Sequence, residues 1–265
     1  MFQAFKRYWS LFLQLAKMAF STATVSKFDF WSFVIGKLVR IVLFLVLIVS
    51  LFRFTDNIVG FTKGQMILLY ATMNLIDIIV QVFFFRGFHA LQHEVRKGNF
   101  DFALTKPVDP LVLTTFRYVD LMDIVTLLPS VGILVWAIVE IGSATFSQAI
   151  WYTLLSLNGL AIVYGIGLIF GGLTFYTTQM ENIWMFYRHG MQMARFPVDI
   201  YSGFFRFTFT FILPIAVIVT FPAKAYFGIL SLPFYLYSFG LSIVLIMFGK
   251  WFWNHALAKY QSASS

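Results

Sequence analysis

Six predominantly apolar runs, each of about twenty residues, decide what this chain can fold into. Only 11% of its 265 residues are charged and 60% are hydrophobic, whereas a soluble domain carries about 25% charged residues. A water-soluble fold cannot bury this much apolar surface, and a helix can cross a bilayer with every backbone group hydrogen-bonded internally. The sequence therefore predicts an all-α membrane protein with six transmembrane helices. The predicted spans are residues 33–52, 65–85, 120–141, 149–176, 204–221 and 234–252.

A separate amphipathic helix with a short linker is predicted at residues 1–26, before the six-span domain at 27–265. Phe5 and Trp9 fall on one face at helical spacing, and Lys6 falls on the opposite face. A basic helix with an aromatic face is typical of the membrane interface. The alternative is an ordinary packed surface helix.

Lysine and arginine predict the orientation of the spans. A net charge of +8 would suggest nucleic acid in a soluble protein, but in a membrane protein cytoplasmic loops collect basic residues. An even number of spans puts both termini on one side. With the termini inside, sixteen Lys and Arg residues fall inside, among them Lys37, Arg40 and Arg206. The three that fall outside are Arg53, Lys63 and Lys224. The sequence thus predicts cytoplasmic termini.

Two segments in the C-terminal third of the chain are not predicted to cross the membrane. Residues 177–201 are polar and amphipathic, and are predicted on the inner side. Residues 222–233 are apolar but too short to cross, so we expect them to re-enter the membrane or lie at its outer interface.

A polar stripe follows one face of the second predicted span. Tyr70, Asn74, Asp77 and Gln81 are spaced four, three and four residues apart, which places them on one side of a helix. An aspartate inside a bilayer costs about 2.5–3.5 kcal/mol on insertion scales, so Asp77 requires a partner. The stripe is a candidate substrate path or proton relay. The alternative is a structural hydrogen bond to a neighbouring span.

The loop at residues 86–118 is a candidate contact for a soluble partner. A short polar helix is predicted at 87–97, and glycine and proline residues then break the chain. Phe100, Phe102 and Leu104 form an apolar group within a charged rim, as in protein interfaces. The candidate contact residues are Glu94, Arg96, Lys97, Gly98, Phe100, Asp101, Leu104, Lys106 and Pro107. The alternative is that the apolar residues hold the loop beneath the spans.

A small-xxx-small pattern runs from Gly167 to Gly171 on the fourth predicted span. Such a pattern lets two helix backbones approach closely. Packing within the chain is the favoured interpretation, and a seam between two subunits is the alternative.

The chain shows no catalytic or metal-binding motif. His89 and His93 lie four residues apart beside Glu94, which is not the H-E-x-x-H zinc signature. There is no cysteine to supply a thiolate, and no G-x-x-x-x-G-K-[ST] loop to hold ATP phosphates. We therefore predict no catalytic residue, no metal and no cofactor in this chain.

Several stretches, in this order along six spans, resemble one family of membrane proteins. They are residues 98–110 (GNFDFALTKPVDP), 195–201 (RFPVDIY), 212–216 (ILPIA), 221–223 (FPA) and 253–264 (WNHALAKYQSAS). The first resembles the "G-x-hydrophobic-D-x-x-L-x-x-P" loop, and the last the closing "W-x-x-G-L-x-x-Y-x-S-A", of type-2 ATP-binding-cassette (ABC) transporter permeases. His255-Ala256 stands where that family carries a basic residue and glycine. The resemblance covers most of the chain and points to the bacterial six-span export branch, often multidrug permeases.

The resemblance implies a specific assembly. Two permease subunits, identical or sister chains, would sit on two separate ATPase subunits that bind ATP and Mg²⁺. The N-terminal helix and the loop at 86–118 would touch those ATPases, and the substrate path would lie between the permeases. The chain would be a multi-pass protein of the bacterial plasma membrane, in contact with lipid and exporting a small-molecule or lipid-like substrate. Neither enzymatic activity nor nucleic-acid binding is implied.

Three other functions stay open on sequence alone. An ion-coupled secondary transporter could use Asp77 and would need no ATPase. An integral membrane enzyme acting on lipid would need a clustered set of catalytic groups, for which only the loop residues His89, His93 and Glu94 are available. A membrane component of a vitamin-uptake system would carry paired Ala-Arg-Gly-type coupling motifs, which the chain lacks.

Overall fold

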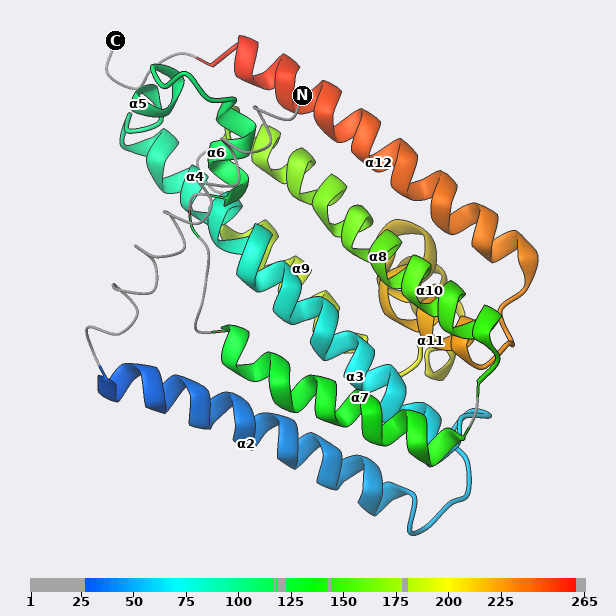
Figure 1. The fold of residues 1–265 in the computed structure, drawn as a ribbon. Coiled ribbons are helices and arrows are strands. Elements are labelled where there is room, and N and C mark those ends of the chain that lie inside the picture. The colour runs from blue at the N-terminus through cyan, green and yellow to red at the C-terminus, as the bar shows by residue number, and fades with distance from the viewer. Residues whose placement is uncertain (1–26, 117, 119–122, 143, 178–180, 261–265) are drawn as a thin grey trace.

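The computed structural model describes residues 27–116, 118, 123–142, 144–177 and 181–260, so the helix predicted at 1–26 lies outside the described residues. The described residues form helices and contain no strand (Figure 1). Five helical segments are long and apolar enough to cross a membrane, and a sixth candidate, Gly203–Ile212 with Ala216–Tyr226, is bent by 76°. The predicted all-α multi-span class is confirmed. The five segments are Phe30–Leu51, Lys63–Arg96, Asp123–Ile141, Phe146–Leu173 and Leu232–Ala258.

The second span forms the centre of the bundle. Helix α3 (Lys63–Val80) continues through a π-helical turn, η1 (Gln81–Phe85), into α4 (Arg86–Arg96). Most of α3 is buried, and the flanking helices are α2 (Lys27–Leu51) and α7 (Leu127–Ile141), the latter preceded by the 3₁₀ turn η2 (Asp123–Thr126) (Figure 1). The polar helix predicted at 87–97 is therefore an extension of the second span rather than a separate loop helix.

Helices α8 (Phe146–Leu173) and α12 (Leu232–Ala258) pack side by side and run in the same direction. Early in both helices, Asn158 Nδ2 donates to Ser238 Oγ at 2.8 Å and to the Ser238 carbonyl at 3.0 Å. Farther along, Gly165 lies against Leu245 and Gly171 against Trp253. The glycines thus serve close packing within the chain, as the sequence predicted.

Because α8 and α12 are parallel, the chain between them must return across the bundle. Helix α9 (Glu181–Met193) begins this return alongside α3. The Arg188 guanidinium lies 5.4 Å from the centre of the Phe85 ring, near the end of that span. Arg195 lies 5.3 Å from the Phe44 ring, which itself packs on Tyr70. The prediction that residues 177–201 stay on the inner side is wrong, because most of this segment lies beside α3.

The bent segment after α9 turns back on itself. It comprises α10 (Gly203–Phe207), η4 (Thr208–Ile212), η5 (Ala216–Thr220) and α11 (Phe221–Tyr226). Asp199 Oδ1 accepts hydrogen bonds from Arg206 Nη2 at 2.8 Å and from Lys224 Nζ at 2.9 Å. In a straight helix, residues 206 and 224 would stand about 27 Å apart. Both ends of the segment therefore lie at one level.

This arrangement corrects two predictions. Residues 204–221 do not form the predicted fifth span; the segment bends by 76° and returns, so re-entry starts earlier than the predicted 222–233. Arg206 and Lys224 were also assigned to opposite sides of the membrane, which their shared contact with Asp199 rules out.

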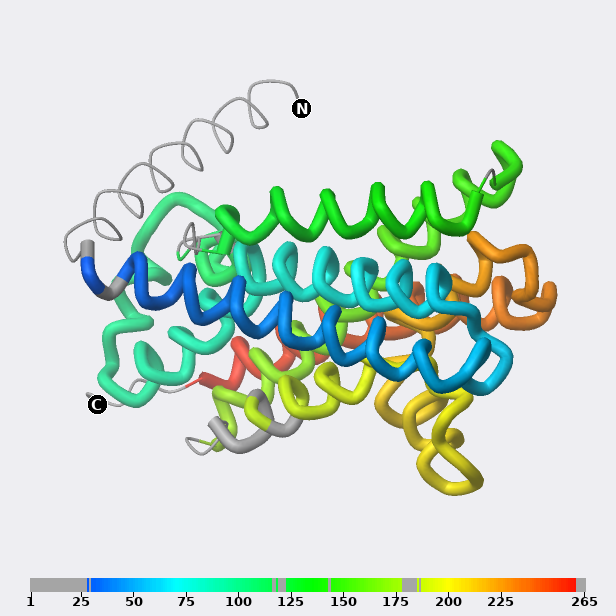
Figure 2. Tube along the Cα trace, turned by 90° about the horizontal axis from the view of Figure 1, so that it is seen from below, coloured from blue at the N-terminus to red at the C-terminus, as the bar shows by residue number. Residues whose placement is uncertain are grey.

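The loop elements gather at one end of the bundle. Helices α5 (Asp101–Leu104) and α6 (Pro110–Phe116) follow α4 and lie at the end where α2 begins and α12 finishes (Figures 1 and 2). The 3₁₀ turn η3 (Val198–Ile200) lies towards the opposite end, near the re-entrant segment.

Candidate functional site

The loop between α4 and α6 is tightly held by the spans. Gly87 allows α4 to cross α6 closely, because a Cβ at this position would stand 1.9 Å from the Thr114 carbonyl oxygen. Gly98 ends α4 with a φ of +71°, the left-handed conformation that glycine adopts most easily. Tyr118 donates a 2.6 Å hydrogen bond to Glu94 Oε1. Glu94, a predicted contact residue, thus braces the loop internally.

The position of Phe100 contradicts its predicted role in an apolar docking group. Its side chain is completely buried, with ring centres 5.3 Å from Phe175 and 5.6 Å from Tyr260. Burial raises the pKa of the Tyr260 hydroxyl, and the neighbouring Asp101 raises it further. Phe100 cannot touch a partner directly; it fastens the loop to the ends of α8 and α12. For Phe100 the alternative interpretation, in which apolar residues hold the loop beneath the spans, is the correct one.

The exposed tip of the loop has the character of a contact surface. Phe102 is 70% exposed and Leu104 is 41% exposed, both on α5. Exposed Arg96, Lys97 and Lys106 lie on the flanking segments. Of the other predicted contact residues, Pro107 is exposed and Gly98 and Asp101 are half-buried. An apolar centre within a basic rim remains, with Phe102 and Leu104 as its anchors.

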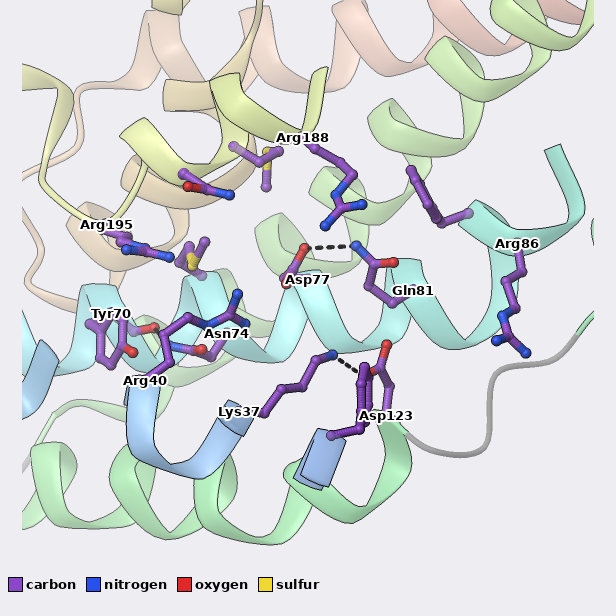
Figure 3. Close-up of a pocket in the computed structure, with 15 residues that line it drawn as sticks. Lys37, Arg40, Tyr70, Asn74, Asp77, Gln81, Arg86, Asp123, Arg188 and Arg195 are labelled. Atoms are coloured by element: carbon purple, nitrogen blue, oxygen red, sulfur yellow. Dashed lines mark hydrogen bonds and ion pairs between the residues drawn. The ribbon is translucent and has the colours of Figure 1, made fainter. Parts of the chain in front are cut away.

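A polar cavity of about 240 Å³ lies between α2, α3 and α9 (Figure 3). All four residues of the predicted polar stripe line it: Tyr70, Asn74, Asp77 and Gln81. Asn74 Nδ2 donates to the Tyr70 carbonyl at 2.8 Å, and Gln81 Nε2 reaches Asp77 Oδ1 at 3.5 Å. The hydrogen bonds on the stripe thus run along the α3–η1 segment itself, and all four residues also line the cavity, with Tyr70 packed on Phe44 of α2 as well.

Sequence reasoning missed the basic residues of this cavity. Lys37 and Arg40 were assigned to the cytoplasmic end of the first span, but both line the cavity together with Arg86, Arg188 and Arg195. Arg40 lies at the middle of the 22-residue candidate span Phe30–Leu51. The available signal was their position inside an apolar run, because a charge within a span is costly and usually functional.

Two acidic side chains offset part of this charge. Lys37 forms an ion pair with Asp123, whose side chain is almost fully buried. Asp77 faces the cavity opposite Arg188 (Figure 3). The described lining residues therefore comprise five basic and two acidic side chains. Such a cavity can bind an anion, whereas a cation would meet net repulsion.

The described residues offer no metal site, since no group of three His, Cys, Asp or Glu side chains is placed to hold an ion. His89 stacks on Phe85 at 5.8 Å between ring centres, and His93 is exposed. The lipid-enzyme alternative therefore gains no metal centre from this part of the chain.

Comparison with known proteins places these features in a family. Residues 38–264 match the family described as "ABC-2 family transporter protein". No curated protein and no solved structure gives a significant match. The matched region includes most of the first helical span and all of the other four, the α4–α6 loop and nearly all of the cavity, so this chain belongs to the ABC-2 transporter family as one of its membrane proteins.

Proposed function

We propose that the chain is the transmembrane subunit of an ATP-driven exporter in a bacterial plasma membrane, with both termini cytoplasmic. Two such permeases, identical or sister chains, would be energised by two separate ATPase subunits that bind ATP and Mg²⁺. The observation that carries this proposal is the exposed apolar tip, Phe102 and Leu104, on a loop that is otherwise anchored to the spans. Apolar anchors inside a polar rim concentrate binding energy at interfaces.

The anchoring of the loop explains how a soluble partner could move the spans. Helix α4 is continuous with α3 through η1, so a force on the loop reaches the second span along a helix axis. The Phe88 ring packs on Gly167 and Gly171 of α8. Phe100 contacts Tyr260, just beyond α12. A push on the tip would therefore act on three helices together.

An ion-coupled secondary transporter is the second candidate function. The observation that favours it is the position of Asp77, a carboxylate in a membrane cavity. The two candidates differ in energy source. Export through an ABC-2 transporter stops when ATP is removed and persists without an ion gradient; an ion-coupled transporter behaves in the opposite way.

The exporter assignment can be tested by replacing the two exposed apolar side chains at the tip of the loop. We expect the double variant Phe102→Ala with Leu104→Ala to retain less ATPase on purification from native membranes, while its thermal midpoint stays close to that of the unmodified chain. The matched control is Phe146→Ala with Val59→Ala, which removes similarly exposed apolar side chains at the opposite end. The assignment is wrong if both double variants hold the ATPase equally well and couple hydrolysis to export.

A further inference from the structure

The basic residues of the cavity are spread along the second span, and this spread limits which ligands the cavity can hold. Figure 3 shows Arg86 at one end of the cavity, Arg188 beside Gln81 and Asp77, and Arg195 with Tyr70 at the other end. Along the continuous helical segment α3–η1–α4, the positions from Tyr70 to Arg86 cover about 24 Å. The cations thus form a series along a path and are not confined to one interface.

Holding this much positive charge among apolar helices is costly unless it is compensated. Each basic side chain within a span costs about 2.5–3.5 kcal/mol on insertion scales. Lys37 is paired with Asp123, so within the described lining Arg40, Arg188 and Arg195 face the single remaining carboxylate, that of Asp77. Electrostatic attraction is also stronger in a medium of low dielectric constant than in water. An anion entering the cavity would therefore be held strongly and would offset the charge excess.

The guanidinium groups of two cavity arginines are placed so that they can bind an oxyanion. Arg188 lies over the Phe85 ring and Arg195 over the Phe44 ring, at 5.4 and 5.3 Å. Such contacts use the flat face of the guanidinium, while its N–H donors lie in the plane at its edge. A phosphate or carboxylate group accepts two parallel hydrogen bonds from that edge. Arg40 and Arg188 are also exposed in the single chain, so a ligand can reach them.

We propose that this cavity binds the anionic group of the transported molecule, a phosphate or carboxylate that passes along the series of arginines. The inference rests on the proposed transport function and names its substrate class. The source of the group can be an amphiphile with an anionic headgroup or a soluble organic anion. Asp77 then has the opposite role to the cations: its negative charge limits how tightly an anion is held.

A binding experiment without any ATPase tests this inference separately from the exporter assignment. The purified full chain, carrying a dye on the single cysteine of Ser264→Cys, would be titrated in nonionic detergent by thermophoresis. The probes are dioctanoyl phosphatidic acid, dioctanoyl phosphatidylcholine and phenyl phosphate. We expect the phosphatidic acid to bind at least about tenfold more tightly than the zwitterionic lipid, with an advantage that falls as salt is raised. Similar binding of phenyl phosphate would identify a soluble anion as the source, and weak binding would identify an amphiphile.

Substitutions of the basic and acidic lining residues should change the affinity for the anion in opposite directions. Arg188→Gln or Arg195→Gln should weaken anion binding about tenfold, because each removes a charge-assisted hydrogen bond. Arg188→Lys, which keeps the charge, should retain part of the affinity, and Asp77→Asn should increase it. Arg53→Gln removes an exposed charge outside the cavity and should change nothing. Equal affinity for the two lipids, or equal effects of Arg188→Gln and Arg53→Gln in chains of unchanged thermal midpoint, would overturn the inference. ATPase retention in the tip experiment would be unaffected by that result.

Discussion

The ring of Phe88, on α4, lies directly against Gly167, on α8: a Cβ added at Gly167 would stand 2.8 Å from Phe88 Cε2. This contact joins the helix that leads into the loop to a span that is remote in sequence. Gly171, one turn later, receives the other edge of the same ring. The two glycines therefore form a groove for an aromatic side chain, and the loop cannot move without disturbing α8.

Gly167→Ala should lower the thermal midpoint of the purified chain. The added methyl group overfills a packed contact, which costs about 1–3 kcal/mol. The control is Gly240→Ala on α12, where a Cβ would meet no atom within 4 Å; this variant should be neutral or more stable by up to about 1 kcal/mol because alanine favours helix. Equal thermal midpoints for the two variants would contradict the packing described for Phe88.

Phe100→Ala and Phe102→Ala should have opposite consequences, although the residues are two apart. Phe100 is fully buried, so its truncation should cost about 3–5 kcal/mol of stability. Phe102 is 70% exposed, so its truncation should change stability by less than about 0.5 kcal/mol while weakening retention of the ATPase. Thermal unfolding and co-purification, measured on both variants, check the pair. A destabilised Phe102→Ala would place that ring inside the chain.

Cysteine labelling should show that the segment between α9 and α12 returns to the side from which it starts. The chain contains no native cysteine. Ser202→Cys and Ile229→Cys, both at exposed positions, should react with an impermeant reagent from the same side as Thr62→Cys. His93→Cys, at the loop end, should react only from the other side. Labelling of Ser202→Cys together with His93→Cys would restore residues 204–221 as a full span.

Asp199→Asn should loosen the re-entrant segment. One carboxylate binds both Arg206 and Lys224, and the Asp199 and Lys224 side chains are only 12% and 18% exposed. Removing the charge should cost about 1–3 kcal/mol of stability. The control is Glu140→Gln, which breaks the more exposed Lys63–Glu140 pair and should cost less than about 1 kcal/mol. If the two variants lose equal stability by thermal unfolding, Asp199 does not hold the segment.

Asp77→Asn should leave the fold and membrane insertion close to normal, because the amide keeps the shape and removes a charge from the membrane interior. Export measured in inverted vesicles should nevertheless fall, since a more tightly held anion leaves more slowly. Export by the unmodified chain should persist when an ionophore abolishes the ion gradient and ATP is supplied. Loss of export under that condition would favour the ion-coupled alternative.

The all-α multi-span class was predictable because apolar runs of membrane length leave few alternatives. The face of α3 that carries Tyr70, Asn74, Asp77 and Gln81 was predictable for a similar reason, since helical periodicity fixes which residues share a side. Its environment was not predictable, because the helices that complete the cavity, α2 and α9, are distant in sequence from α3. Counting charges by side also used Lys37 and Arg40 only as markers of the cytoplasmic end of the first span, although both lie well inside that span and line the cavity.

The α9 and re-entrant region was missed for a different reason. A hydropathy pattern favours the apolar residues 204–221 as a span over the polar residues 177–201. In the structure α9 instead lies beside α3, because its polar face lines the cavity, and the apolar segment folds back, because Asp199 holds both of its ends together. The exposure of Phe102 and burial of Phe100 could likewise not be separated by sequence, since both are phenylalanines in one short apolar group.

The π-helical turn η1 sets the angular relation between the second span and the loop. It lies where the cavity meets α4, and Gln81 and Phe85 at its two ends both line the cavity. A π-turn contains one residue more than an α-turn. In an uninterrupted α-helix, everything beyond it would be rotated by about 100° around the helix axis. The π-turn therefore sets the face on which Arg86 meets the cavity, so one local distortion of the helix fixes both the charge that faces the cavity and the direction in which α4 carries the loop.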